Sequence, residues 1–139
     1  KLEELIHATG FFRNKAKAII GLAAALVDRH GGEVPEAMDD LVKLPGVGRK
    51  TANVVRSVWF RRPAIPVDTH VQRLGSRLGL SKETDPVKIE LALQEILPEA
   101  DWSFTATALI WHGRRVCFAR NPQCAGCELR ADCPFPKRR

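Results

Sequence analysis

The stretch "LPGVGRKTA" at residues 44–52 interrupts one helical pattern and opens the next. Its two glycines, Gly46 and Gly48, predict a tight turn, because glycine adopts positive φ without strain and has no side chain to block a close approach. Apolar residues at spacings of three and four follow it and predict a helix over about 49–60. The stretch therefore predicts two packed helices joined by a short glycine turn.

The same helical spacing recurs on both sides of this turn, while period-two alternation is absent over any useful length. We therefore predict an all-α chain. Glycine and proline positions divide it into about six or seven helices. The first is expected to end at Gly10, and the others to span about 14–30, 35–43, 49–60, 69–78, 86–97 and 104–116.

The longest apolar run, "IIGLAAALV" at residues 19–27, belongs to the second of these helices. It is far too short to span a bilayer, and Asp28, Arg29 and His30 follow it where a signal peptide would need small residues. We interpret it as a buried helix in an intracellular protein that is neither secreted nor bound to a membrane. Its inner face is expected to hold Ala16, Ile19, Ile20, Ala23, Leu26 and Val27.

The 139 residues include 45% hydrophobic and 27% charged side chains, which is typical of a folded globular protein rather than a disordered one. Lysine and arginine number 22 against 16 acidic residues, so the net charge is +6. That excess favours a polyanionic partner, with nucleic acid as the leading candidate. Positive charge also occurs on proteins without such a partner, so charge alone leaves the partner open.

The segment "RRPAIPVD" at residues 61–68 has two prolines and no helical period, which indicates a boundary between domains at 1–62 and 63–139. Asp68 ends this segment directly before a predicted helix, where aspartate is a favoured N-cap. A carboxylate at a domain boundary can also accept a proton or stabilise a developing cation. His70 offers a second titratable group two residues later, although a lone histidine is more often structural.

The glycine turn and the helix after it have two possible roles. Free N–H groups and the positive end of the helix dipole would face outward together, which makes an anion site suited to a DNA phosphate. A plain turn between packed helices would use the same glycines. Lys50, in the first turn of the helix, is electrostatically disfavoured as a cation, and a neutral lysine can form a Schiff base with an aldehyde-level carbon. A solvated surface lysine is the alternative.

All four cysteines fall in the last 23 residues, with gaps of six, two and five residues between them. Disulfides are one interpretation, but a chain that is Cys-free over its first 116 residues does not resemble a secreted disulfide scaffold. Four thiolates in one short loop suit a metal centre. The spacing leaves zinc and a [4Fe-4S] cluster equally open, since both accept four cysteine ligands. The candidate ligands are Cys117, Cys124, Cys127 and Cys133.

Taken together, "LPGVGRKTANVV", "VDTH" and the cysteine spacing closely resemble the endonuclease III family of base-excision DNA glycosylases. The match runs over essentially the whole chain. The resemblance implies a helix-hairpin-helix DNA glycosylase fold. It places a partial helical-barrel domain at 1–62, with the helix-hairpin-helix motif at about 36–60, and a second helical domain at 63–139 that ends in a [4Fe-4S] cluster loop over 117–133.

The resemblance also implies the chemistry. Lys50 matches the family's catalytic lysine, which attacks C1′ of the damaged nucleoside, expels the base and holds the opened sugar as a Schiff base. Asp68 matches the essential aspartate, which assists the lysine and stabilises the cationic sugar. The related adenine glycosylases lack the lysine, so Lys50 favours the bifunctional type, a glycosylase and AP lyase that removes oxidised pyrimidines and then cleaves the strand by β-elimination. The alternative is a non-catalytic DNA-binding module with a structural metal site.

The expected partner is double-stranded DNA with a damaged base or an abasic site, bound by a monomer. The turn is expected to grip a phosphate through backbone N–H groups, and Phe11 aligns with an apolar wedge that enters the DNA stack. Family members carry several more helices before the point where this chain begins, so residues 1–62 are expected to expose apolar surface. The predicted DNA contacts are Phe11, Leu44, Gly46, Val47, Gly48, Arg49 and His70.

Overall fold

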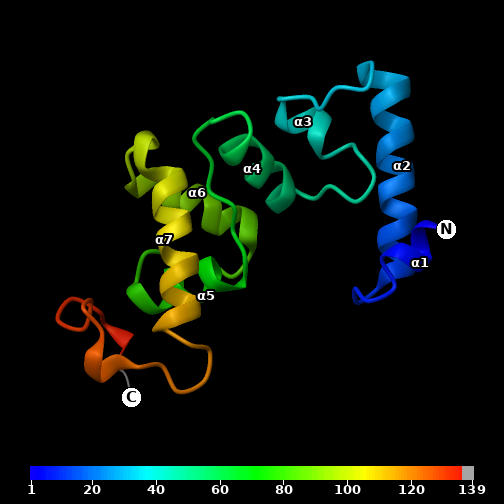
Figure 1. Cartoon of the computed structure of the whole chain (residues 1–139). Coiled ribbons are helices and arrows are strands. Elements are labelled where there is room, and N and C mark those ends of the chain that lie inside the picture. Colours follow the sequence, from blue (N-terminus) through cyan, green and yellow to red (C-terminus); the bar gives the residue numbers. More distant parts are fainter. Residues whose placement is uncertain (136–139) are drawn as a thin grey trace.

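The computed structural model describes residues 1–135, and its helices confirm the all-α prediction, since no strand occurs among those residues. Residues 136–139, the end of the predicted second domain, lie outside the described residues. Figure 1 shows α1 to α3 on one side, α5 to α7 on the other, and α4 between them. The elements are α1 (Leu2–Leu5), α2 (Phe12–His30), α3 (Met38–Leu41), α4 (Arg49–Val58), α5 (Thr69–Leu78), α6 (Pro86–Ile96) and α7 (Trp102–Arg115), with 3₁₀ turns η1 (Glu99–Asp101) and η2 (Cys124–Gly126).

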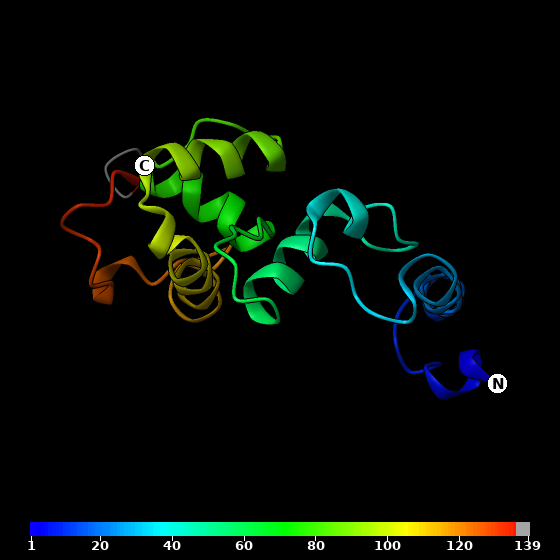
Figure 2. The same cartoon turned by 90° about the horizontal axis from the view of Figure 1, so that it is seen from above.

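The group formed by α5, α6 and α7 has its own apolar core. Side chains from the three helices and from the segment before α5 meet there, and none is more than 7% exposed. Figure 2 shows the three helices gathered at one end of the molecule, away from α2. The core consists of Ile65, Val67, Val71, Leu74, Ile89, Leu93, Ala106 and Leu109.

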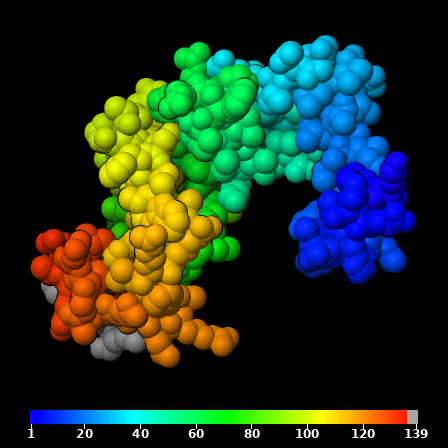
Figure 3. Space-filling view, viewed as in Figure 1, coloured from blue at the N-terminus to red at the C-terminus, as the bar shows by residue number. Residues whose placement is uncertain are grey.

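The group formed by α1 to α4 has a smaller core of Ala25, Leu41, Leu44 and Ala52. One side of α2 stays open, because Ile20 is 60% exposed and Val27 is 67% exposed. Ile19 and Ala23 are exposed as well, so the expected inner face of α2 is wrong for four of its six residues, while Ala16 is buried and Leu26 is half-buried. The expected apolar surface on residues 1–62 is present. Figure 3 shows a wide hollow between the N-terminal segment and the α5–α7 group.

The described helices include none that is both long and apolar enough to cross a bilayer. The longest, α2, has 19 residues but carries charged side chains at both ends.

Helix boundaries follow the sequence where a strong end signal is present. The helices α4, α5 and α6 begin at the expected residues. Helix α2 ends at His30, and its C-cap Gly31 has a left-handed backbone with φ of 60°. Two of the predicted helices are shorter in the structure. The first helix stops after Leu5, and the one expected over 35–43 keeps only Met38–Leu41. Glu36 pairs with Arg62 instead of entering a helix, and residues 33–36 are non-helical.

Candidate functional site

The glycine turn between α3 and α4 is fixed by packing against α2. The Leu44 side chain is buried, and the N–H of Leu44 donates to the carbonyl of Leu41 at 3.1 Å. Gly46 has φ of 75°, and a Cβ at this position would lie 2.7 Å from Cβ of Ala18 on α2. Both the backbone conformation and the space therefore require glycine at position 46.

Some backbone N–H groups of this turn donate hydrogen bonds within the protein, and others do not. Those of Leu44 and Val47 donate within the turn, so they are not available to a ligand. Those of Gly46, Gly48 and Arg49 have no acceptor in the described part of the chain, and the N-cap Gly48 has no side chain to supply one. A Cβ on Gly48 would meet open space, so a ligand has room to approach. The free donors and the positive end of the α4 dipole make this turn a candidate anion-binding site.

Lys50 is the second residue of α4, and its side chain is exposed. Its amine forms no hydrogen bond or ion pair with the described residues. A shallow pocket brings Lys50 and Asp68 together, although they are 18 positions apart in the sequence. The pocket is lined by Lys50, Val67, Asp68, Thr69, His70, Gln72, Pro86 and Arg114.

Asp68 caps the N-terminus of α5, as its position before a helix predicts. One carboxylate oxygen, Oδ1, accepts from the N–H groups of His70 at 2.8 Å and Val71 at 2.9 Å. The second oxygen, Oδ2, accepts no hydrogen bond from the described residues. Asp68 therefore caps its helix with one oxygen and leaves the other unbonded by the described residues, so the structural role and a functional role are compatible.

His70 is held between α5 and α7. Its Nδ1 lies 3.1 Å from Nη2 of Arg73, which also donates to the carbonyls of Gly113 and Cys117 at 3.0 Å. A Cβ on Gly113 would lie 2.8 Å from Nδ1 of His70, so α7 approaches α5 closely at this point. The ring is therefore part of the helix packing as well as of the pocket wall.

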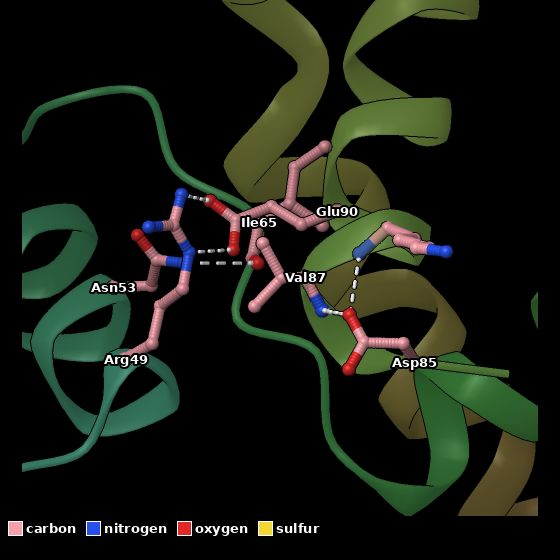
Figure 4. A network of polar contacts seen from close by, with 7 residues as sticks. Arg49, Asn53, Ile65, Asp85, Val87 and Glu90 are labelled. Atoms are coloured by element: carbon pink, nitrogen blue, oxygen red, sulfur yellow. Dashed lines mark hydrogen bonds and ion pairs between the residues drawn. The ribbon is translucent and has the colours of Figure 1, made fainter. Parts of the chain in front are cut away.

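The Arg49 side chain points to α6 rather than to the turn (Figure 4). Its Nε donates to Oε2 of Glu90 at 2.7 Å and its Nη2 to Oε1 at 3.0 Å, which forms a bidentate ion pair. The hydrogen bond from Arg49 to Glu90 raises the pKa of Arg49, burial opposes this effect, and the charges of Glu90 and Asp39 add to it. In this structure the contribution of Arg49 to the anion site is thus its free N–H.

The sequence did not predict that two polar residues in this region, Asn53 and Glu90, are buried. The helical spacing over about 49–60 puts Asn53 with Lys50 on the side opposite the apolar residues, which predicts exposure. In the structure Asn53 is 1% exposed, and its Nδ2 donates to the carbonyl of Ile65 at 3.3 Å. Glu90 is 4% exposed. One signal for Glu90 was available, since it follows Ile89 and precedes Leu93 on the buried side of α6. No comparable signal marks Asn53.

Phe11 lies at the start of α2, in the N-terminal group. It is 84% exposed and has a left-handed backbone with φ of 58°. The neighbouring Phe12 instead packs its ring against His7, with 4.6 Å between ring centroids. Of the two phenylalanines, Phe11 is therefore the one that projects, and a non-glycine residue with positive φ is strained there.

The four cysteines are free, half-buried and line one cavity beside the end of α7. Arg77 donates to Sγ of Cys117 at 3.2 Å, and Nε2 of His112 lies 3.6 Å from Sγ of Cys127. Within residues 1–135, no three Cys, His, Asp or Glu side chains are placed together as metal ligands. The donor set of four thiols around one cavity, with an arginine to balance negative charge, fits a group held by four thiolates.

A glycine turn before α4 with unbonded N–H groups, next to an exposed lysine, is typical of proteins that bind nucleic acid. The model of the HhH-GPD superfamily of base excision DNA repair proteins matches residues 1–99. The chain belongs to this family.

The curated relatives of this chain include several proteins named endonuclease III. That of Synechocystis is 53% identical over 135 residues, which cover 96% of this chain and 62% of the relative. That of Thermotoga maritima is 45% identical over 99% of this chain and 65% of the relative, and that of Bacillus subtilis is 50% identical over 96% and 61%. The chain thus spans between 61% and 65% of the length of these relatives.

Solved structures agree with the fold. A trapped covalent intermediate of endonuclease III with DNA superposes with a TM-score of 0.94 at 48% identity, over 99% of this chain and 65% of that one. A non-covalent complex of endonuclease III with DNA also gives 0.94, at 47% identity. A thermostable thymine-DNA glycosylase gives 0.87 at 23% identity, which supports the fold alone. The helix-hairpin-helix DNA glycosylase fold is therefore confirmed.

Proposed function

We propose that this protein is a bifunctional DNA glycosylase and AP lyase that removes oxidised pyrimidines from double-stranded DNA. The observation that carries the proposal is that Lys50, whose amine has no partner among the described residues, and Asp68, whose Oδ2 accepts no hydrogen bond from them, line the same shallow pocket. The similarity of the chain to a structure named as a trapped covalent endonuclease III–DNA intermediate supports it.

Lys50 is the nucleophile in this proposal. Its neutral amine attacks C1′ of the damaged nucleoside, the bond from C1′ to the base breaks, and the base leaves with the electron pair and takes up a proton. Opening of the sugar ring converts the adduct into a Schiff base. Loss of a C2′ proton then expels the 3′ phosphate by β-elimination, and water releases the lysine.

Asp68 supports this chemistry through Oδ2. A carboxylate beside C1′ stabilises the positive charge that develops as the base departs, and it can accept a proton from the incoming amine. The two N–H bonds to Oδ1 hold the carboxylate in place while it does so. The helix cap is therefore a positioning device for the reactive oxygen.

The free N–H groups of Gly46, Gly48 and Arg49 bind DNA in this proposal, because together they can donate to the oxygens of one phosphate group. The strained and exposed Phe11 is the wedge that fills the stack when a base is flipped. His70 and Arg114 in the pocket wall add contacts to the same strand. Because phosphates dominate this interface, affinity is expected to fall steeply with added salt, and a flat response would contradict phosphate binding.

The four cysteines are the proposed ligands of a [4Fe-4S] cluster. When bound, the cluster supplies cross-links that fix the loop after α7, a role that a few apolar residues cannot fill. Arg77 and His112 lie against the ligand sulfurs and orient them. Brown, iron-containing protein with about four irons per chain is expected. Colourless protein that holds zinc and no iron would overturn the cluster assignment.

A borohydride trap tests the function. The purified protein is incubated with duplex DNA that contains an abasic site and reduced, and a covalent adduct is expected. Lys50→Ala should abolish the adduct, while Lys43→Ala, which removes a nearby lysine outside the pocket, should leave it intact. An absent wild-type adduct, or a full yield from Lys50→Ala, would leave only a DNA-binding module.

A further inference from the structure

The position of Lys50 relative to Asp68 depends on how α4 is attached to the α5–α7 group. Lys50 belongs to α4, whose buried Ala52 packs in the core of the first group. Asp68 belongs to α5, whose side chains form the core of the second group. The two cores share no residue, so neither buried core contains side chains of both α4 and α5.

Two polar ties connect α4 to the second group. The first is the ion pair of Arg49 with Glu90 on α6, and the second is the bond from Asn53 to the carbonyl of Ile65. Arg49 and Asn53 lie one helical turn apart, so both ties leave the same face of α4. Figure 4 shows both ties side by side, with Glu90 entering from α6.

The ion pair is the stronger tie. The Glu90 side chain is 5% exposed, and Arg49 supplies the hydrogen bonds that it accepts within the described residues. Removal of Arg49 would leave a buried carboxylate without a partner, which is strongly unfavourable. The fork of the guanidinium matches both carboxylate oxygens, so the pair fixes orientation as well as distance.

The first turn of α4 has no side-chain cap. Its first N–H groups have no acceptor within the helix, and its N-cap Gly48 supplies no side chain. By contrast, α5 and α6 are capped by Asp68 and Asp85, each with two hydrogen bonds. Lys50 therefore lies in a first turn that has no side-chain cap, and the neighbouring Arg49 attaches this turn to α6.

We propose that Arg49 is a positioning residue for Lys50. Its ion pair with Glu90 anchors the first turn of α4 to α6 and so holds the Lys50 amine toward Asp68. The chemical consequence of this inference rests on the proposed function of Lys50, while the anchoring itself does not.

The inference differs from two other roles for Arg49. If Arg49 leaves Glu90 and contacts a DNA phosphate, loss of the carboxylate should free the cation and strengthen binding. If the pair only stabilises the fold, its loss should lower the unfolding temperature without a selective effect on the reaction. Positioning predicts a slower chemical step at nearly unchanged DNA affinity, because a small displacement of a nucleophile is costly.

The experiment compares Glu90→Gln with Glu36→Gln in the purified protein. Both variants remove a carboxylate that pairs with an arginine, but Glu36 pairs with Arg62 and has no tie to α4. The single-turnover rate of adduct formation with abasic-site DNA is measured at saturating protein, together with the dissociation constant for the same duplex. Glu90→Gln is expected to slow the reaction about tenfold or more, with the dissociation constant changed less than about threefold. Glu36→Gln should leave both unchanged.

A second variant keeps the inference testable if Glu90→Gln folds poorly. Arg49→Lys keeps the charge but loses the bidentate fork, so a smaller loss of rate is expected. Exchanging the two groups in Arg49→Glu combined with Glu90→Arg should recover part of the rate lost by either change alone. An unchanged rate in Glu90→Gln and Arg49→Lys, or tighter DNA binding by Glu90→Gln, would overturn the inference.

Hydrogen exchange separates this inference from the proposed function. Amide protons of residues 51–55 in α4 should exchange faster in Glu90→Gln than in wild type or Glu36→Gln, with or without DNA. If wild-type protein forms no adduct, the lyase assignment fails, and exchange still decides whether the pair anchors α4. Equal exchange in all three proteins would contradict the anchoring.

Discussion

The N-termini of α4 and α5 face the same pocket but are built in opposite ways. The α5 terminus is closed, because Oδ1 of Asp68 accepts from the N–H groups of His70 and Val71. The α4 terminus is open, because its N-cap Gly48 has no side chain and its first N–H groups lack an acceptor in residues 1–135. The capped N-terminus of α5 fixes the orientation of the Asp68 carboxylate, while the uncapped N-terminus of α4 has N–H groups that can bind an anion.

This difference assigns a separate task to each helix. A capped helix end is stable on its own and can present a fixed reactive oxygen. An uncapped end loses that stabilisation and gains an anion site. The sequence encodes the choice in one residue for each helix, with aspartate before α5 and glycine before α4.

The largest effect is expected from Asp68, where two substitutions separate the cap from the chemistry. Asp68→Asn keeps an amide oxygen for the cap, so stability should be nearly unchanged while the rate of adduct formation falls by about a hundredfold or more. Asp68→Ala should lose the same activity and also about 1 kcal/mol of unfolding free energy. Urea unfolding and single-turnover trapping measure the two effects. An Asp68→Asn protein with normal activity would show that Asp68 is only a cap.

The next effect concerns the glycine turn that presents the open terminus. Gly46→Ala places a side chain at a φ of 75° and 2.7 Å from Cβ of Ala18, so a loss of about 1–3 kcal/mol of unfolding free energy is expected. Gly10→Ala is the matched control, because a Cβ there meets nothing within 4 Å and its φ is not in the left-handed range. Similar unfolding curves for the two variants would mean that the turn does not require glycine.

A smaller effect is expected when α4 is given an aspartate N-cap like that of α5. Gly48 has φ of −90° and ψ of 170°, a conformation that suits an aspartate N-cap. Gly48→Asp should therefore stabilise the protein by a few tenths of a kcal/mol and weaken DNA binding about tenfold, since the carboxylate takes the N–H groups and repels phosphate. Ala100→Asp, on the exposed η1 turn, adds the same charge elsewhere as a control. Equal DNA affinities would argue against a phosphate at α4.

The smallest effect concerns pH. The pKa of Arg49 is raised, chiefly by its hydrogen bond to Glu90. A raised pKa in the folded state contributes stability that is complete below the unfolded pKa and is lost only as pH rises through the folded value, far above neutrality for arginine. The Glu90→Gln change is added to Arg49→Met so that no unpaired buried carboxylate titrates in the variant. The difference in unfolding free energy between wild type and this double variant should thus stay constant from about pH 6 to about pH 10. A steady decline over this range would contradict a fixed Arg49 cation.

The sequence predicted those features that depend on local signals. The helices expected to begin at residues 49, 69 and 86 do begin there, because the residues before them act as end signals over a short range. The structure shows Gly48, Asp68 and Asp85 as the N-caps of α4, α5 and α6. The spacing of the cysteines likewise anticipated their common cavity.

Features that depend on tertiary contacts were not predictable in this way. The burial of Asn53 arises where α4 meets the linker, which no spacing within α4 specifies. The spacing within α6 places Glu90 on the buried side, but its pairing with Arg49 depends on how α4 and α6 meet. The exposure of Ile20 and Val27 on α2 has the same origin, since burial of an apolar face depends on what packs against it. The site was found from local motifs, whereas the contacts that hold its parts together came from the fold.

The most direct measurement identifies the residue that carries the trapped sugar. Protein reduced with borohydride on abasic-site DNA is digested, and the modified peptide is located by mass spectrometry. The account predicts one modified residue, Lys50, in the peptide that follows the glycine turn. A modified Lys43, a modified N-terminal amine or the absence of any adduct would contradict it.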